Sequence, residues 1–257
     1  MSGSYFGALG DLSARWTLLL LDPRGTGESD RPSGPSAYRL EDYAADLDEL
    51  RRHLGLQRLD LLGHSHGGFV AVVWASDYPE TVGRLVLANT LVRFSRDSGD
   101  ATESEMSRRA GEPWYQDAVG AREHRLSGPG RLAGDRELGT LFARELPLYF
   151  VEWGPEEEAF GDKLAREGRN GDAMRFFNTE IAPTFDLRDR LGRITSPTLV
   201  ITGERDFVGT PDAAEEIASG LPDATLVVLP GSGHFSFVES GGRRPFAEAV
   251  LDFLGAG

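Results

Sequence analysis

The chain has 257 residues, of which 40% are hydrophobic and 26% charged, and its formal net charge at pH 7 is −14. This length and composition suit one globular domain, or a core domain with an insertion. The acidic balance argues against binding to nucleic acid or to an anionic membrane through bulk electrostatics. The sequence contains no cysteine, which excludes disulfide bonds, thiol catalysis and cysteine metal sites.

The first apolar run spans Trp16 to Leu21. It is far shorter than the roughly 20 residues that a membrane-spanning helix needs. No basic segment of the signal-peptide type precedes it, so we expect a cytoplasmic protein with no membrane partner. The leucines at 18–21 predict a strand that ends at Asp22 and is covered on both faces, as in a parallel sheet. A turn rich in glycine and proline follows.

Helices and strands are predicted to alternate along most of the remaining chain. Helical spacing of apolar residues and a stop at Gly55 define the first helix, while Thr210 and Pro211 mark the start of a later one. The predicted order is helix 40–54, strand 58–63, helix 67–78, strand 83–90, strand and loop 196–206, helix 210–220, strand and loop 224–234, and helix 244–255. This alternation predicts an open parallel α/β sheet.

The segment of residues 92–190 breaks this alternation. It is charged, with helical stretches interrupted at GEPWYQ, SGPGR and WGPEEE. We therefore expect a core domain of residues 1–91 and 191–257, with residues 92–190 inserted as a helical cap. The cap is expected over the carboxyl edge of the sheet, where ligands bind in such folds.

The stretch GHSHGG, residues 63–68, lies between a predicted strand and a predicted helix. In a G-x-S-x-G elbow the backbone turns sharply at the serine. Gly63 and Gly67 would then remove side chains that clash where strand and helix crowd together. This interpretation makes Ser65 a nucleophile, with the amide of His66 as one oxyanion donor. The alternative is a tight turn of the kind found in any doubly wound sheet.

A serine nucleophile needs a base, and the base needs an orienting carboxylate. His234 lies in the glycine-rich stretch LPGSGHFSF after the last predicted strand and is the expected base. The alternative role for His234 is to cap the final helix. Asp206 follows the penultimate strand in VITGERDF and is the expected carboxylate, with Glu204 as its nearest competitor.

The remaining histidines are in less suitable positions. His53 and His124 are expected at the surface. His64 and His66 flank Ser65 too closely to serve it as a base and are expected to shape the pocket. The histidines form no H-E-x-x-H or comparable ligand set, so no metal ion or other cofactor is expected.

Four stretches together carry a resemblance to a known family: DPRGTGESDRP, GHSHGG, PTLVITGERD and GSGH. They resemble an α/β-hydrolase of the prolyl aminopeptidase (proline iminopeptidase) group, over residues 5–89 and from 185 to the end. The chain order Ser65, Asp206, His234 is that of α/β-hydrolase triads. Arg24 and Asp22 are interpreted as structural members of ion pairs that brace the rim of the site.

The resemblance implies a metal-free hydrolase that releases an N-terminal proline or a similar residue from a short peptide or a small-molecule amide. It also implies that carboxylates of the cap hold the α-amine of the substrate. The cap offers five glutamates for this role, and the sequence does not select among them: Glu152, Glu156, Glu157, Glu158 and Glu180.

Two departures from the family pattern matter. His66 stands where the family usually has an aromatic residue, which favours a broader hydrolase such as an esterase or lactonase. The family also has further strands and a His-Gly-Gly-Pro-Gly loop, the source of the second oxyanion N–H, before the segment that matches residues 3–12. We therefore expect an N-terminally incomplete sequence in which the strand between residues 18–21 and 59–62 is missing. A non-catalytic ligand-binding protein or truncated remnant is the alternative, and the sequence says nothing about the oligomeric state.

Overall fold

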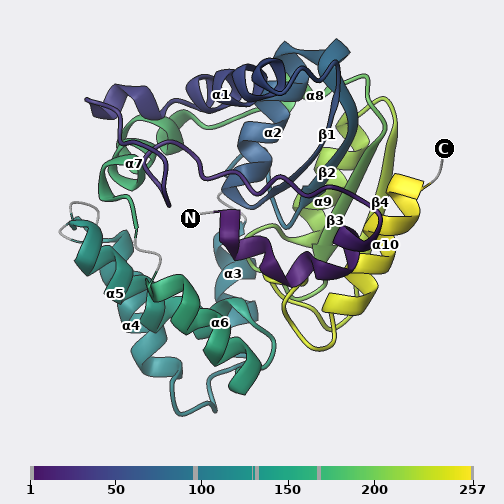
Figure 1. The fold of residues 1–257 in the computed structure, drawn as a ribbon. Helices are drawn as coiled ribbons and strands as arrows, with labels where there is room; N and C mark the ends of the chain where they lie inside the picture. The colour runs from purple at the N-terminus through teal and green to yellow at the C-terminus, as the bar shows by residue number, and fades with distance from the viewer. Residues whose placement is uncertain (1–2, 95–97, 129, 131–132, 167–168, 256–257) are drawn as a thin grey trace.

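A four-stranded parallel sheet forms the centre of the molecule (Figure 1). The structure is a computed structural model that describes residues 3–94, 98–128, 130, 133–166 and 169–255. The strands lie in chain order: β1 (Leu59–His64), β2 (Val82–Ala88), β3 (Thr198–Gly203) and β4 (Ala224–Leu229). The predicted parallel α/β sheet is confirmed. Because all four strands run in the same direction, their carboxyl ends meet at one edge.

Helices cover both faces of the sheet (Figure 1). One layer contains α1 (Leu40–His53), α2 (His66–Asp77), α8 (Arg188–Leu191) and α9 (Pro211–Gly220). The other contains the 3₁₀ helix η1 (Gly3–Ala14) and α10 (Arg243–Gly255). Successive residues of β2 serve the two layers in turn, as strand geometry requires: Leu85 and Leu87 join the first core, Val86 and Ala88 the second.

The helix after the G-x-S-x-G stretch is buried on all sides. Every residue of α2 from Gly68 to Ser76 is buried, because α1 and α8 pack on it from one side and the sheet from the other. This explains why its sequence shows no polar stripe.

The predicted cap of α9 is confirmed: the Thr210 side chain accepts a hydrogen bond from the Ala213 N–H at 3.2 Å.

The predicted strand over residues 16–22 is wrong, since these residues form no strand. The side chains of Leu19 and Leu20 are 51% and 46% exposed, so the run is not covered on both faces. A strand needs a neighbour to bond its N–H and C=O groups. Among the residues that the structure describes, no strand lies between this run and β1, which forms the edge of the sheet.

In the described part of residues 92–190, helices and helical turns are joined by loops and bends. The helices are α3 (Ser98–Ser107), α4 (Tyr115–Leu126), α5 (Asp135–Glu145), α6 (Pro155–Arg166) and α7 (Gly171–Phe176). Shorter turns are η5 (Leu146–Tyr149), η6 (Phe177–Ile181) and η7 (Ala182–Thr184) here, with η2 (Pro35–Tyr38) and η3 (Pro79–Thr81) elsewhere. A bridge between Arg93 and Asp186 joins the two ends of the segment. Its division from the core as a separate domain stays a prediction.

No helix in the described ranges is long and apolar enough to span a bilayer.

The glycine-rich loop after Asp22 is fastened to α1. Arg24 makes a two-point contact with Asp46, with N–O distances of 2.7 and 2.6 Å, and donates a further hydrogen bond to the Ala37 carbonyl at 2.9 Å. This confirms Arg24 as a structural ion-pair member. The Asp22 carboxylate accepts the Glu28 N–H at 2.9 Å and closes the turn.

The Arg24–Asp46 pair leads to a first prediction. The pair is bidentate but partly exposed, at 23% and 40% of the two side chains. Breaking it by Arg24→Gln or Asp46→Asn is expected to lower the free energy of unfolding by about 0.5–1 kcal/mol. Chemical denaturation of the two single variants and the double variant measures the coupling. Arg244→Gln, which breaks an exposed pair with Glu248, is the matched control. Strictly additive single effects would show that the pair does not brace the loop.

Candidate active site

Ser65 occupies a strained turn between β1 and α2. Its backbone has φ 53° and ψ −122°, a conformation that residues with a side chain rarely adopt. The turn is held on both sides: the Ser65 N–H donates to the Ala88 carbonyl at 3.0 Å, and its own carbonyl accepts the Thr90 hydroxyl at 2.8 Å. Ser65 therefore has the backbone strain that a nucleophile elbow requires.

The glycines around Ser65 differ in how much space a side chain would have at each position. A Cβ on Gly63 would lie 2.5 Å from the Gly67 carbonyl oxygen, so strand and helix do crowd together there. The expectation for Gly67 is wrong, because a Cβ on that residue would meet open space. The second position that excludes a side chain is Gly68, where a Cβ would lie 2.4 Å from the Thr90 hydroxyl. The same hydroxyl bonds the Ser65 carbonyl.

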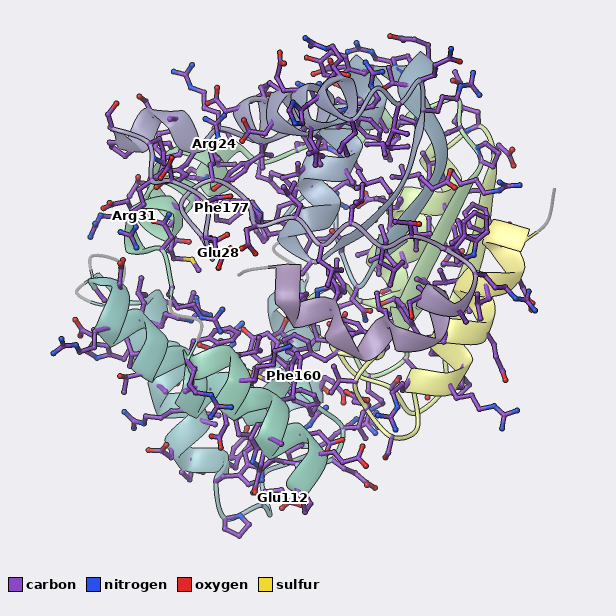
Figure 2. The ribbon with its side chains drawn as sticks, viewed as in Figure 1. Arg24, Glu28, Arg31, Glu112, Phe160 and Phe177 are labelled. Carbon is purple, nitrogen blue, oxygen red and sulfur yellow. The ribbon has the colours of Figure 1, made fainter. Side chains whose placement is uncertain are left out.

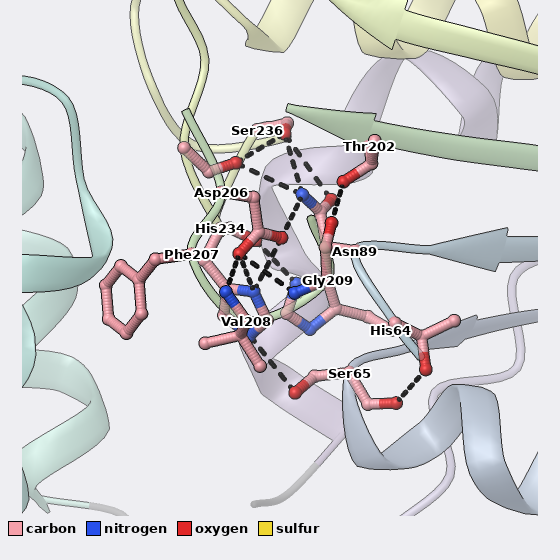
Figure 3. A network of polar contacts seen from close by, with 12 residues as sticks. His64, Ser65, Asn89, Thr202, Asp206, Phe207, Val208, Gly209, His234 and Ser236 are labelled. Carbon is pink, nitrogen blue, oxygen red and sulfur yellow. Dashed lines mark hydrogen bonds and ion pairs between the residues drawn. The ribbon is translucent and has the colours of Figure 1, made fainter. Parts of the chain in front are cut away.

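The structure brings Ser65, His234 and Asp206 into one hydrogen-bonded chain (Figure 3). The Ser65 Oγ lies 3.1 Å from Nε2 of His234, and Nδ1 of His234 lies 2.9 Å from Oδ2 of Asp206. With Asp206 ionised, Nδ1 carries the proton and Nε2 accepts from the serine hydroxyl. The three residues come from loops after β1, β3 and β4, at the carboxyl edge of the sheet.

Asp206 is a buried carboxylate, 3% exposed, surrounded by donors. Its Oδ1 accepts the N–H of Val208 at 2.7 Å and that of Gly209 at 3.1 Å. Burial by itself raises the pKa of this carboxyl. The adjacent His234 and the hydrogen bonds outweigh burial, so the pKa lies below its usual value. Asp206 therefore stays ionised and can hold His234 in one orientation.

Asn89 is a residue of the site that the sequence analysis missed. It is completely buried at the end of β2, and its Nδ2 donates to Oδ2 of Asp206 at 3.0 Å and to the Gly233 carbonyl at 3.1 Å. Its φ of 49° lies in the left-handed region, which asparagine tolerates better than most residues. A polar residue directly after a buried strand was the available signal.

His64 fixes the backbone of His234. Its Nε2–H donates to the His234 carbonyl at 2.7 Å, and its Nδ1 accepts the hydroxyl of Tyr5 from η1. Burial, reinforced by the neighbouring His234 ring, lowers the pKa of His64 to about 3, so it is neutral near pH 7. Its expected pocket-shaping role stays a prediction, while these contacts make it a structural link between η1, the elbow and the His234 loop.

The other candidates lie outside this chain of contacts. Glu204 is exposed and accepts the Gly231 N–H at 2.9 Å instead of contacting His234. His53 and His124 are exposed, as expected. His66 is also exposed, with its ring edge against Tyr43, Phe69 and Phe177. Within the described ranges, no group of three or more His, Asp or Glu side chains is placed to hold a metal ion.

His66 is the first residue of α2. The N–H groups in the first turn of a helix have no partner within the helix and lie at its positive dipole end. The amide of His66 can therefore donate to an oxyanion formed at Ser65. Its assignment as an oxyanion donor stays a prediction.

The five cap glutamates differ in their surroundings. Glu157 is buried, and its Oε2 accepts the Gly154 N–H at the start of α6. Glu156 lies 3.8 Å from Arg243. The other three are exposed: Glu152, Glu158 and Glu180. Nothing in their contacts selects one of them as a ligand for an amine.

Glu239 is a second buried carboxyl beneath the His234 loop. It is 4% exposed and accepts the Gly233 N–H, with oxygen distances of 2.8 and 3.1 Å. Burial raises its pKa to about 7, and the negative charge of Asp206 acts in the same direction. The charge of Glu239 therefore changes in the neutral pH range. The residue that it bonds, Gly233, directly precedes His234 in the chain.

Known proteins share both the sequence pattern and the fold. The pattern of a family described as the alpha/beta hydrolase fold matches residues 1–241 of this chain. A proline iminopeptidase of Lactiplantibacillus plantarum is 28% identical over 249 residues, which cover 92% of this chain and 82% of that protein. A 2-(acetamidomethylene)succinate hydrolase of Mesorhizobium japonicum is 28% identical over 245 residues, covering 95% and 81%.

Among solved structures, the enol-lactonase from Burkholderia xenovorans is similar. It superposes with a TM-score of 0.72 at 27% sequence identity, and the match covers 98% of this chain and 86% of the enol-lactonase. These proteins carry out different hydrolytic reactions, so the similarity reaches the fold and the general reaction without selecting a substrate.

The contacts that link Tyr5, His64 and His234 predict that removal of the Tyr5 hydroxyl lowers the reactivity of Ser65. Tyr5→Phe keeps the ring in its aromatic cluster but removes the donor that holds the proton of His64 on Nε2. Without that donor, His64 can change tautomer and lose its bond to the His234 carbonyl. The rate at which Ser65 reacts with a fluorophosphonate is expected to fall about tenfold, the equivalent of one hydrogen bond. Tyr78→Phe, at the far end of α2, is the matched control, and equal rates in both variants would refute this role.

The raised pKa of Glu239 predicts a pH dependence of stability. In the unfolded chain Glu239 ionises near pH 4.5, whereas in the folded protein it holds its proton to about pH 7. The stability that it contributes is therefore complete below pH 4.5 and lost as pH rises to about 7, by up to about 3 kcal/mol. In Glu239→Gln this loss should be absent, so the free energy of unfolding should differ less between pH 5 and pH 8 than it does in the wild-type chain. Denaturation curves measure it, with the exposed Glu248→Gln as control, and an unchanged difference would exclude Glu239 as the cause.

Proposed function

The chain belongs to the alpha/beta hydrolase fold family, and on that premise we propose that it is a serine hydrolase that forms an acyl-enzyme on Ser65. The family and its relatives make the chain a hydrolase, with the α/β-hydrolase fold expected from the sequence. The observation that carries the finer proposal is the unbroken chain of hydrogen bonds from Ser65 through His234 to the buried Asp206.

The proposed reaction has two half-reactions. The Ser65 Oγ attacks the carbonyl carbon of the substrate while His234 Nε2 takes the hydroxyl proton. The imidazolium then gives this proton to the leaving amine or alcohol, and the acyl group stays on Ser65. A water molecule attacks the ester, His234 takes its proton and returns it to Ser65 Oγ, and the carboxylic acid leaves. Asp206 stays ionised throughout and stabilises the imidazolium, for which its lowered pKa suits it.

The oxyanion of each tetrahedral intermediate needs preorganised donors. The His66 amide, at the start of α2, is the donor that we propose. We assign no second donor. Because removal of one such donor typically lowers the rate by about 10²–10³, a site with the His66 amide alone is expected to be slow.

For the substrate, we propose a small molecule or short peptide, with prolyl aminopeptidase-like cleavage of an N-terminal residue as one candidate. The proline iminopeptidase relative and the motifs around Ser65 support it. An ester or lactone is the second candidate. Two observations favour it: His66 presents an exposed polar ring beside the nucleophile, and the chain is similar to an enol-lactonase. A ligand-binding protein without catalysis is the alternative outside the enzyme class.

Reaction with a fluorophosphonate tests the proposal most directly. The wild-type chain is expected to be labelled at Ser65, and Ser65→Ala to be unlabelled. Ser13→Ala, which changes an exposed serine of η1, controls for non-specific labelling. His234→Gln should reduce the labelling rate by about 10³ or more, because the serine then lacks its base. A wild-type chain that binds no label while remaining folded would leave the ligand-binding alternative.

Substrate profiling separates the two candidate classes. Prolyl and alanyl 4-nitroanilides report aminopeptidase activity, and short-chain 4-nitrophenyl esters and simple lactones report esterase or lactonase activity. The same Ser65→Ala variant must abolish every activity that is assigned to this site. Hydrolysis of esters and lactones without any anilide would remove the aminopeptidase candidate.

A further inference from the structure

Residues 149–151 run beside the loop that carries His234. The Tyr149 carbonyl accepts the His234 N–H at 2.9 Å. Two residues further along the chain, the Val151 N–H donates to the carboxylate of Glu239, which lies in the turn after His234. This short segment therefore bonds both the expected base and a buried acid that the proposed reaction does not use.

Packing makes the segment a rigid support. The Phe150 carbonyl accepts a hydrogen bond from Nε of the buried Arg109 at 2.7 Å. The Phe150 ring stacks on Phe235 with a centroid distance of 4.9 Å, and Phe160 of α6 packs on Phe235 at 5.4 Å. Phe160 lies where α6 meets η1 (Figure 2). Because all three rings are buried, residues 149–151 have little freedom to move.

Glu239 joins this support to the loop of His234. Its carboxylate accepts the Gly233 N–H, at 2.8 and 3.1 Å from the two oxygens, and the Ser232 hydroxyl at 3.4 Å. A Cβ on Gly233 would lie 2.7 Å from Oε1 of Glu239 and 2.7 Å from the Tyr149 carbonyl oxygen. Only glycine fits in this place. The close approach of Glu239 and Tyr149 thus explains the glycine that precedes His234 in GSGH.

Hydrogen bonds hold the backbone on both sides of His234. Glu239 bonds the N–H of the preceding residue, and the His234 carbonyl accepts Nε2–H of His64 at 2.7 Å. The His234 ring lies at the limit of its reach, since its Nε2 is 3.1 Å from Oγ of Ser65 and such bonds span about 2.7–3.2 Å. A misplacement of about 1 Å can lower a rate about 100-fold. Small displacements of this backbone therefore affect the reaction.

The contacts of Glu239 suit its ionised form. An ionised carboxylate only accepts hydrogen bonds, and it has three donors here: the N–H groups of Gly233 and Val151 and the hydroxyl of Ser232. Protonation places a hydrogen on one oxygen and removes the charge that makes such bonds about twice as strong. The bonds that join the His234 loop to residues 149–151 then weaken.

Charged groups of both signs surround Glu239. Asp206, after β3, repels its negative charge, and Arg109, just after α3, attracts it. Glu105 bonds both Arg109, at 3.2 Å, and Arg205, at 2.6 Å. Burial raises the pKa of Glu239 to about 7, so its ionisation lowers the stability of the fold. A buried acid that reduces stability when it ionises is typical of a functional position.

We propose that Glu239 is a positioning residue of the active site, whose ionised carboxylate joins the peptide before His234 to residues 149–151 and so keeps the imidazole within reach of Ser65. This inference rests on the proposed acyl-enzyme chemistry at Ser65 and adds a control of its rate by pH. Glu239 acts through the backbone of the loop, since its oxygens bond backbone N–H groups and one hydroxyl.

The rate at which a fluorophosphonate labels Ser65, measured from pH 5 to pH 9, tests the inference. Glu239→Gln keeps the shape of the side chain but cannot ionise. The wild-type chain is expected to react about tenfold faster than this variant at pH 9, the equivalent of one charge-assisted hydrogen bond. The ratio should fall to about one at pH 5, where Glu239 is protonated in the wild-type chain too. Protonation of His234 lowers both rates together.

A purely structural role would lower the rate of Glu239→Gln by the same factor at every pH. Such a constant ratio, or equal rates at pH 9, would overturn the inference and leave the proposed function standing. Glu239→Asp keeps the charge but is one methylene shorter, so it cannot span both N–H groups and should be as slow as Glu239→Gln at pH 9. A wild-type rate in Glu239→Asp would also overturn the inference. Glu248→Gln changes an exposed acid of α10 and should match the wild-type chain throughout.

The backbone amide resonances of Gly233 and Val151 test the bonds without catalysis. In the wild-type chain both should shift with a midpoint near pH 7 as Glu239 ionises, and in Glu239→Gln neither should. Absence of this titration from the wild-type chain would overturn the inference even if Ser65 is reactive. A folded wild-type chain whose Ser65 never reacts would refute the proposed function and with it any role of Glu239 in the reaction, whereas the titration would still report the bonds.

Discussion

The buried charge of Asp206 is the constraint on which the site depends. A carboxylate that is 3% exposed is costly to bury unless donors surround it. The chain supplies them from separate segments: backbone N–H groups of Val208 and Gly209, the amide of Asn89 and the ring of His234. Each of these bonds also positions a segment that has another task. The turn after β3, the end of β2 and the loop after β4 are thereby fixed relative to one another at a single edge of the sheet.

The sequence was sufficient to predict the elements whose signals are local. Apolar runs and cap residues located all four strands and the helices α1, α2, α9 and α10, including the Thr210 cap of α9, but not η1 or α8. The sequence could also predict that Ser65, His234 and Asp206 lie together, because each follows a strand and parallel strands bring their carboxyl ends together. The prediction that a side chain would clash was correct for Gly63, where a Cβ would meet the carbonyl of Gly67, four residues away. It was wrong for Gly67, where a Cβ would meet open space, and it missed Gly68, whose close contact is with Thr90 after β2.

What the sequence could not supply depends on partners distant along the chain. The leucines at 18–21 have the composition of a buried strand, but a strand forms only where another strand can bond it, and composition does not reveal that neighbour. Asn89 lies within the predicted strand of residues 83–90, and its role becomes evident only when Asp206 and Gly233 are placed around it. Tyr5 is similar: its contact with His64 joins residues 59 positions apart. Pairing of this kind is decided by tertiary packing, which one sequence does not display.

The distribution of charge within the cap bears on the choice of substrate. Its deepest acid, Glu145, is completely buried and is already bonded by Arg125 at 2.5 Å and by the Tyr149 hydroxyl at 2.5 Å. Glu157 bonds the backbone at the start of its own helix. The buried acids of the cap are thus used to hold the cap together and to fix Tyr149 against His234, which leaves them unsuited to capture the amine of a peptide.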